Sequence, residues 1–228
     1  MDEARFCRIA LRTTDPDAAA AFYDAVLGQR GDGIVPIAHD ARARGARPMW
    51  LGHVDVSQRG GVAAQREAWL AAGATALGPQ SDAFALLRDP GGAILALVES
   101  SARSQAEIVW HQLHTADASR VAPLYARQLG WALHGDDTAT LARRPFAWND
   151  GGAIVGSIAD VAGTPGAHPH WIFFFGVLDL HAALDHVRAR GGRVLGPMEL
   201  RPGVRVAVCD DPQGAAFGIA ELGAPPPR

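Results

Sequence analysis

The stretch FCRIALRTTD at residues 6–15 is matched by IVWHQLHTAD at residues 108–117, an offset of 102 residues. Shorter matches follow in the same order: FY with LY (22–23 and 124–125), LG with LG (27–28 and 129–130), PMW with PHW (48–50 and 169–171), and DPGG with DPQG (89–92 and 211–214). An ordered set of matches indicates an internal duplication. We therefore expect two tandem domains, residues 1–99 and 108–222, joined by a linker at 100–107 and followed by a proline-rich tail at 223–228.

Helices and strands are expected to alternate in each copy. Asp15-Pro16 is typical of a helix start and Gly28 of a helix end, which predicts a helix over residues 17–26. The matching helix opens at residues 116–117 and ends at Gly130, and Pro123 is expected to delay or kink it. Second helices are predicted over 62–72 and 180–190. The predicted strands are 6–12, 83–88, 94–98, 109–114, 153–158, 170–177, 205–209 and 216–220.

The composition excludes several classes of function. The 228 residues carry 21 basic and 24 acidic side chains, a balance that predicts neither a nucleic-acid partner nor a membrane partner. Every basic residue is arginine, so chemistry that needs a lysine is excluded: P-loop and kinase phosphate binding, and Schiff bases. Cys7 and Cys209 are too few for a disulfide framework and are expected to be buried thiols. With no apolar span and no signal-peptide pattern at the start, we expect a cytoplasmic protein.

The ordered motifs resemble those of the vicinal oxygen chelate superfamily, which includes glyoxalase I, bleomycin-resistance proteins and extradiol dioxygenases. The shared features are a first strand running into Thr-x-Asp, then Phe-Tyr and Leu-Gly, and a final Asp-Pro-x-Gly turn. PHW at 169–171, Gly191-Gly192 and DPQGA at 211–215 are most similar to two-domain glyoxalase-like proteins of actinobacteria. The resemblance covers about residues 6–222. It implies an α+β fold with tandem glyoxalase-like domains, each built from paired βαβββ modules whose curved mixed sheets form a cup.

The same resemblance places the metal ligands of the superfamily at defined positions. Catalytic members hold a divalent metal in the cup with side chains from the first, fifth and last strands. The corresponding positions here are Arg8, Leu51 and Ala96 in the first copy, and Trp110, Ile172 and Gly218 in the second. None of these side chains is a metal ligand. We therefore expect no cofactor, with a divalent metal possible only at a non-standard site.

Strand alternation nominates the residues that would line the cups instead. In the second copy, Trp110, Gln112 and His114 share one strand face, and His170 and Phe174 share another with Ile172. Aromatic walls with a few polar groups are typical of a small-molecule pocket. The candidate ligand-binding residues are Trp110, Gln112, His114, His170 and Phe174, with Arg8, Arg12 and His53 in the first copy.

Each candidate also has a plain structural interpretation. Trp110 is as well explained by core packing, and His114 and His170 by positions at strand ends. Arg8 and Arg12 bind an anionic ligand on one interpretation and pair with Asp55 or other carboxylates on the other.

Three functional hypotheses follow. The first is a metal-free protein that binds a hydrophobic or aromatic small molecule in its cup. The alternative is a lyase, isomerase or dioxygenase-type enzyme, with a metal relocated to Gln112, His114 and His170 or with His114 as a general base. The third treats the shortened first copy as a structural half or as the surface of a homodimer, because missing strands leave a sheet edge to cover.

Overall fold

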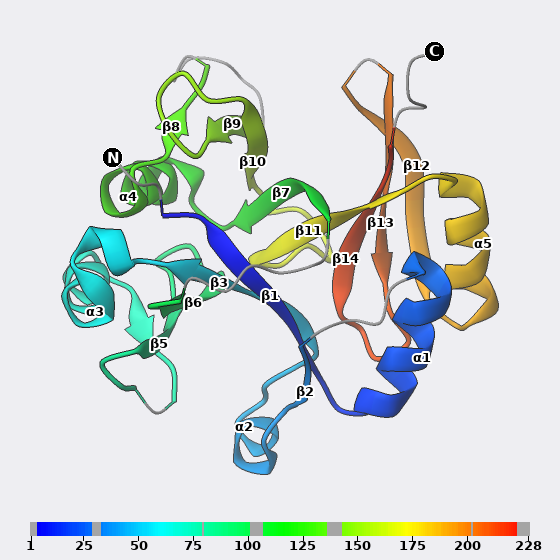
Figure 1. The fold of residues 1–228 in the computed structure, drawn as a ribbon, viewed down its shortest axis with the longest axis horizontal. Coiled ribbons are helices and arrows are strands. Elements are labelled where there is room, and N and C mark those ends of the chain that lie inside the picture. Colours follow the sequence, from blue (N-terminus) through cyan, green and yellow to red (C-terminus); the bar gives the residue numbers. More distant parts are fainter. Residues whose placement is uncertain are drawn as a thin grey trace. The chain divides into compact units, whose positions relative to one another are not determined.

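The structure, a computed structural model, describes residues 4–28, 33–78, 80–100, 107–135, 143–201 and 203–222. The tail predicted at 223–228 and residues 101–106 of the predicted linker lie outside the described residues. The strands are β1 (Phe6–Thr13), β2 (Ile34–Pro36), β3 (Met49–Asp55), β4 (Thr75–Ala76), β5 (Phe84–Arg88), β6 (Ile94–Val98), β7 (Ile108–Thr115), β8 (Ala132–Leu133), β9 (Arg143–Ala147), β10 (Ile154–Asp160), β11 (His170–Val177), β12 (Arg193–Arg201), β13 (Val204–Asp210) and β14 (Ala216–Glu221) (Figure 1). The helices are α1 (Pro16–Leu27), α2 (His39–Ala43), α3 (Gly61–Ala71), α4 (Ala118–Leu129) and α5 (Leu180–Ala189), with a short 3₁₀ turn at Ser57–Arg59.

The strands form two curved mixed sheets, one from each repeat. The first has six strands in the order β2-β1-β3-β6-β5-β4, and the second has eight in the order β12-β13-β14-β11-β7-β10-β9-β8. The expected α+β fold of tandem glyoxalase-like sheets is thereby confirmed. The predicted strands and helices are also confirmed, with ends displaced by at most two residues. The domain boundaries themselves stay predictions.

The first module departs from the expected βαβββ pattern. Modules β3–β6, β7–β10 and β11–β14 each contain one main helix and four strands. In the described part of the first module, β1, α1 and β2 are followed by the short helix α2 instead of further strands. Pro36 and Pro48 bracket this segment, and Gly45 has a left-handed backbone with φ of 87°. Proline and left-handed glycine both interrupt strand pairing, which accounts for the shortened module.

The main helices begin and end where the sequence predicts. Asp15 and Asp117 cap α1 and α4, each accepting a hydrogen bond from a backbone N–H three residues ahead. Gly28 and Gly130 end the same helices in the left-handed conformation, with φ of 64° and 77°. Pro123 lies inside α4 and does not delay its start.

By internal contacts the chain separates into two units, each with parts from both repeats. The α3–α4 unit comprises the described parts of 1–9, 51–103 and 111–171, and the α1–α5 unit comprises the described parts of 10–50, 104–110 and 172–228. Each unit is named for the pair of helices that pack together in it.

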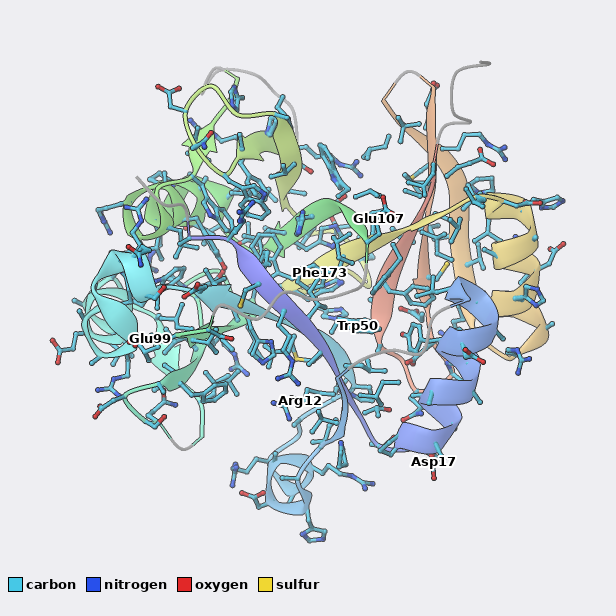
Figure 2. The ribbon with its side chains drawn as sticks, in the orientation of Figure 1. Arg12, Asp17, Trp50, Glu99, Glu107 and Phe173 are labelled. Atoms are coloured by element: carbon cyan, nitrogen blue, oxygen red, sulfur yellow. The ribbon has the colours of Figure 1, made fainter. Side chains whose placement is uncertain are left out.

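The repeated sequence motifs build the same buried hydrogen-bond network in each unit. In the α3–α4 unit, the Tyr125 hydroxyl donates to Asp89 Oδ2 at 3.0 Å and accepts from Trp171 Nε1 at 3.2 Å. The equivalents in the α1–α5 unit are Tyr23, Asp211 and Trp50, at 3.2 and 3.0 Å (Trp50 is labelled in Figure 2). In both networks the tyrosine and the aspartate come from different repeats. The motifs that reveal the duplication are therefore the residues that join its two copies.

One face of the second sheet is covered by helix α5, which packs on β12, β13 and β14. Ala207 and Cys209 of β13 and Phe217 and Ile219 of β14 point to this side and are buried. The alternate residues point to the opposite side, which we call the site face. None of the helices in the described part of the chain is long and apolar enough to cross a membrane.

Candidate functional site

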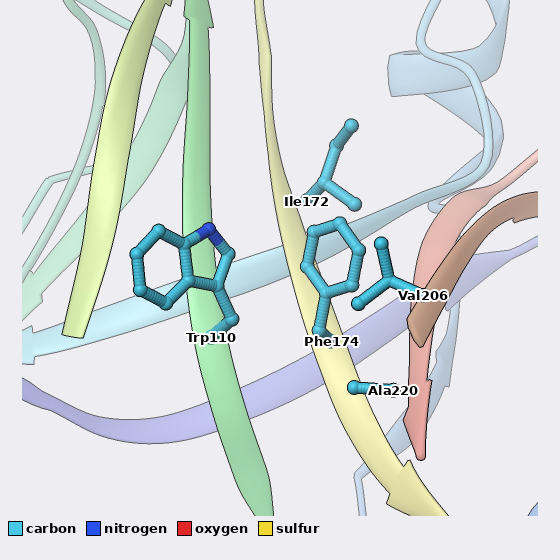
Figure 3. Close-up of a cluster of buried hydrophobic side chains, with 5 residues drawn as sticks. All are labelled: Trp110, Ile172, Phe174, Val206 and Ala220. Carbon is cyan, nitrogen blue, oxygen red and sulfur yellow. The ribbon is translucent and has the colours of Figure 1, made fainter. Parts of the chain in front are cut away.

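An apolar cluster occupies the site face where β7, β11, β13 and β14 contribute side chains. Its buried members are Trp110, Ile172, Phe174, Val206 and Ala220 (Figure 3). Partly buried apolar side chains pack against it from β7, β12 and β13: Val109, Met198, Leu200, Val204 and Val208. Three positions in the second copy correspond to metal ligands of the superfamily. Two of them, Trp110 and Ile172, therefore belong to a hydrophobic core.

The third position, Gly218, lies beneath an aromatic ring. Phe174 and Gly218 are register partners in the parallel pair β11–β14, so their side chains leave the sheet on the same side. A Cβ atom at Gly218 would lie well inside 3.0 Å of the Phe174 ring, closer than real Cβ atoms approach. Because Phe174 is only 1% exposed, the ring has little room to move aside. A glutamate at this position therefore does not fit the packing.

The residues present do not fit the metal that the superfamily resemblance implies. In the first copy Leu51 and Ala96 are buried apolar side chains and Arg8 is an exposed cation. Within the described ranges, no three His, Cys, Asp or Glu side chains are grouped so as to hold a metal ion. The donor set needed by Zn²⁺ or Fe²⁺ is missing from the positions that would supply it.

Trp110 carries a buried polar atom into the apolar cluster. Its side chain is 9% exposed, and its indole Nε1 has no hydrogen-bond partner among the described residues. An indole N–H only donates, and leaving one buried and unpaired costs about 1–3 kcal/mol. The cluster is therefore apolar but presents one unused donor.

A polar cluster lies within the α3–α4 unit. We define it as Gln112, His114, Ser157, His168 and His170. The Gln112 amide nitrogen lies 2.7 Å from His114 Nε2, and the His114 and His170 rings meet edge to face at 5.1 Å. The His168 and His170 rings stack at 4.3 Å. The structure thus brings together three of the predicted site residues, Gln112, His114 and His170.

The contacts of His114 determine its protonation. An amide nitrogen donates, so His114 Nε2 accepts from Gln112 and its ring proton lies on Nδ1. Burial, followed by the charges of Arg143 and His168, lowers the pKa of His114 to about 4. The imidazole is therefore neutral at pH 7 with one nitrogen already occupied, and it is a weak base.

His170 has the opposite nitrogen free. Its Nδ1 lies 2.7 Å from the His168 backbone oxygen, which only accepts, so the proton is on Nδ1. Its Nε2 is buried and has no partner among the described residues. Burial is the main cause that lowers the pKa of His170 to about 4, so Nε2 presents a bare lone pair at pH 7.

Ser157 is a member of this cluster that the sequence reasoning missed. It is the register partner of Gln112 in the parallel pair β10–β7, so both side chains leave the sheet on the same side. The hydroxyl oxygen is buried without a partner in the described structure. A serine within the apolar strand Ile154–Asp160 is the one sequence feature that could have identified it. Which side of the sheet the serine faces depends on the β10–β7 register, which the sequence does not reveal.

The remaining predicted residues lie elsewhere. Arg8 is exposed and Arg12 half-buried on β1 (Figure 2), while His53 is buried on β3 with its ring 6.5 Å from that of Phe84. None of the three predicted residues is a member of either cluster. His111 stacks on Phe6 at 5.5 Å and its Nδ1 donates to the Val155 oxygen at 3.1 Å.

The sequence is similar to known proteins. The family model described as Glyoxalase-like domain matches residues 109–220. Over 92% of its length and 92% of the relative's, the chain is 24% identical to the "Putative glyoxylase CFP32" of Mycobacterium tuberculosis. It is also 28% identical to the anthracycline biosynthesis protein DnrV of Streptomyces peucetius, over 61% of this chain and 52% of that protein.

Solved structures share the fold at low sequence identity. The 2,3-dioxygenase LapB from Pseudomonas sp. KL28 superposes with a TM-score of 0.61 and 13% identity, covering 100% of this chain and 95% of that one. The substrate complex of homoprotocatechuate 2,3-dioxygenase from Brevibacterium fuscum gives 0.63 and 16%, covering 98% and 84%. The repeated motifs, the paired sheets and these matches agree. Together they support a place in the vicinal oxygen chelate superfamily, and the glyoxalase-like match lies in the second repeat, at residues 109–220.

Proposed function

We propose that the site face of the second sheet binds a hydrophobic, aromatic small molecule without using a metal ion. The observation that carries this proposal is the set of side chains at the three positions that correspond to metal ligands in the second copy. Trp110 and Ile172 belong to the apolar cluster, and Gly218 lies under the Phe174 ring. These side chains are buried, so the ligand would lie on the partly buried apolar side chains packed against them, such as Met198, Leu200 and Val208. Such an apolar surface favours a flat aromatic ligand, which gains from the apolar area it buries.

The unused indole N–H of Trp110 adds a polar requirement. A ligand carbonyl or ether oxygen that accepts from Nε1 would remove the cost of leaving this donor unpaired. The binding surface would then resemble other small-molecule sites, with mostly apolar walls and a few oriented polar groups.

The relatives give independent support for an aromatic ligand. DnrV is named for anthracycline biosynthesis, and the Brevibacterium enzyme was solved with 3,4-dihydroxyphenylacetate.

The alternative, an enzyme with a relocated metal or with His114 as a general base, has less support. A relocated metal would need Gln112, His114 and His170 as ligands, but Gln112 already occupies His114 Nε2. A base with a pKa of about 4 is poorly matched to proton abstraction at neutral pH. The predicted homodimer and the cytoplasmic location stay predictions. Sedimentation velocity checks the first and fractionation of cells the second.

The test is calorimetric titration with two aromatic probes, 2-naphthol and 2-methoxynaphthalene. We expect at least one of the two probes to bind saturably to the chain. Its affinity should fall in Trp110→Ala and should fall less in Trp110→Phe, which keeps a ring. Trp69→Phe is the matched control, because Trp69 also has a buried indole N–H without a described partner but lies on helix α3. If neither probe binds, or if Trp69→Phe weakens binding as much as Trp110→Ala, the proposal is wrong.

A further inference from the structure

A chain of oxidisable aromatic rings leads from the surface of the α3–α4 unit into its core. All six tryptophans are described, and Trp148 is the only one of them that is not buried. The centroid of its ring lies 5.0 Å from that of Trp131, which lies 5.2 Å from the centroid of the Tyr125 ring. Trp131 is 2% exposed and Tyr125 is 0% exposed. The three rings therefore form a continuous path from a partly exposed indole to a buried phenol.

The buried end of this path has a proton acceptor in place. The Tyr125 hydroxyl accepts from Trp171 Nε1 at 3.2 Å, so its own proton points to Asp89 Oδ2 at 3.0 Å. Asp89 Oδ1 accepts from the backbone N–H groups of Gly91 and Ala93, as an ionised carboxylate does. Burial raises the pKa of Asp89, which makes it a stronger base than an exposed aspartate. This base matters because a phenol gives up an electron readily only when its proton can leave as well.

We propose that the α3–α4 unit is a one-electron relay that intercepts oxidants at its surface. The oxidant class is an oxygen-centred radical, such as a peroxyl or carbonate radical, which gains one electron from Trp148. Trp148 is restored by an electron from Trp131, and Trp131 by an electron from Tyr125. Tyr125 passes its hydroxyl proton to Asp89 in the same step. The products are the reduced oxidant, two intact tryptophans, a neutral Tyr125 radical and a protonated Asp89.

The α1–α5 unit has the same hydrogen-bond network but lacks the path. The Tyr23 hydroxyl donates to Asp211 Oδ2 at 3.2 Å and accepts from Trp50 Nε1 at 3.0 Å, and both aromatic side chains are buried. Apart from each other, the described ring neighbours of Tyr23 and Trp50 are Phe22, Phe175 and Phe217. A phenylalanine ring is far harder to oxidise than an indole or a phenol. The chain therefore contains its own control, a tyrosine–aspartate pair that packs in the same way without a route for the electron.

The test oxidises the protein with tris-bipyridine ruthenium(III), generated by a light flash in the presence of a quencher, and follows the radicals by transient absorption. A tryptophan radical should appear first, and a neutral tyrosyl radical should replace it. The chain contains only two tyrosines, so Tyr125→Phe should abolish the tyrosyl signal and the matched control Tyr23→Phe should leave it intact. Trp148→Phe keeps a ring at a partly exposed position, and it should still remove most of the tyrosyl yield. Urea unfolding checks that each variant is folded.

A second readout tests the proton transfer. The step from tryptophan to tyrosine should be slower in heavy water, and Asp89→Asn should prolong the tryptophan radical because an amide does not take up the proton. The same rate in ordinary water, in heavy water and in Asp89→Asn would overturn the proposal. A full tyrosyl yield in Trp148→Phe, or equal loss of the signal in Tyr23→Phe and Tyr125→Phe, would overturn it as well. The relay does not involve the site face, so its failure would leave the proposed ligand binding untouched.

Discussion

Adding one methyl group at Gly218 is predicted to destabilise the protein only while the Phe174 ring is present. The backbone does not oppose the change, since Gly218 is not among the glycines with positive φ. Replacing a strand glycine by alanine normally gains roughly 0.5–1 kcal/mol. Here the new Cβ would overlap the Phe174 ring, and overpacking of this kind costs about 1–3 kcal/mol. We therefore expect Gly218→Ala to lower the free energy of unfolding by about 0.5–2 kcal/mol.

In a protein that lacks the Phe174 ring, Gly218→Ala should no longer be destabilising. Phe174→Ala alone should cost roughly 3–5 kcal/mol, because it leaves a cavity in the apolar cluster. In that background Gly218→Ala no longer meets the ring, so it should be neutral or stabilising by roughly 0.5–1 kcal/mol. The double-mutant cycle should therefore report a coupling of about 1–3 kcal/mol between the two positions.

Urea unfolding followed by tryptophan fluorescence measures all four proteins. The urea midpoints give the differences in the free energy of unfolding if this free energy depends on urea concentration with the same slope in all four proteins. An equal loss in both backgrounds, or no loss in either, would refute the inference that Phe174 keeps a carboxylate out of the third ligand position.

Three further predictions concern stability and reactivity. Tyr125→Phe should lower the free energy of unfolding by roughly 2–4 kcal/mol, because it removes the two buried hydrogen bonds that the hydroxyl makes with Asp89 Oδ2 and Trp171 Nε1; urea unfolding checks this, and a loss under about 0.5 kcal/mol would contradict the network. Burial lowers the pKa of His111 from 6.5 to about 4, so the unfolded chain takes up a proton below pH 6.5 that the folded chain does not. The stability that neutral His111 contributes is then fully present above pH 6.5 and falls by up to roughly 3 kcal/mol toward pH 4. The pKa values of His114 and His170 are lowered to about 4 in the same way and add to the loss. Urea midpoints between those pH values measure it, and His111→Gln should reduce the slope without abolishing it. Burial raises the pKa of the Cys209 thiol to about 12, so the folded protein should resist thiol reagents at pH 8 and react on unfolding; fast labelling of the native state would show that the thiol is accessible.

The sequence predicted much of the fold because each repeated motif forms local contacts and also contacts the other repeat. Asp15 and Gly28 set the ends of a helix through the chain around them, which is why its ends were predicted to within two residues. The DPQG turn was recognised only as a motif, and the structure gives its reason. The Gln213 side chain oxygen accepts from the backbone N–H groups of Thr14 and Asp15 at 3.0 and 2.9 Å, tying the turn to the start of α1.

The site was only partly predictable, since its decisive features depend on register and tautomer. Strand alternation placed Trp110 and Phe174 on the site face, and both are in the apolar cluster. It did not reveal that the Phe174 ring lies over Gly218, which follows from the pairing of β11 with β14. The free nitrogen of His170 depends on a backbone oxygen two residues away, a contact that residue types alone do not predict.

The metal-free site is tested most directly by calorimetric titration of 2-naphthol into the protein before and after exhaustive treatment with a chelator. If the apolar cluster and the partly buried side chains packed on it provide the binding surface, affinity and stoichiometry should be the same in both titrations. Loss of binding after chelation, with recovery on adding Fe²⁺, Mn²⁺ or Zn²⁺, would show that a bound ion holds the ligand and would contradict the proposal.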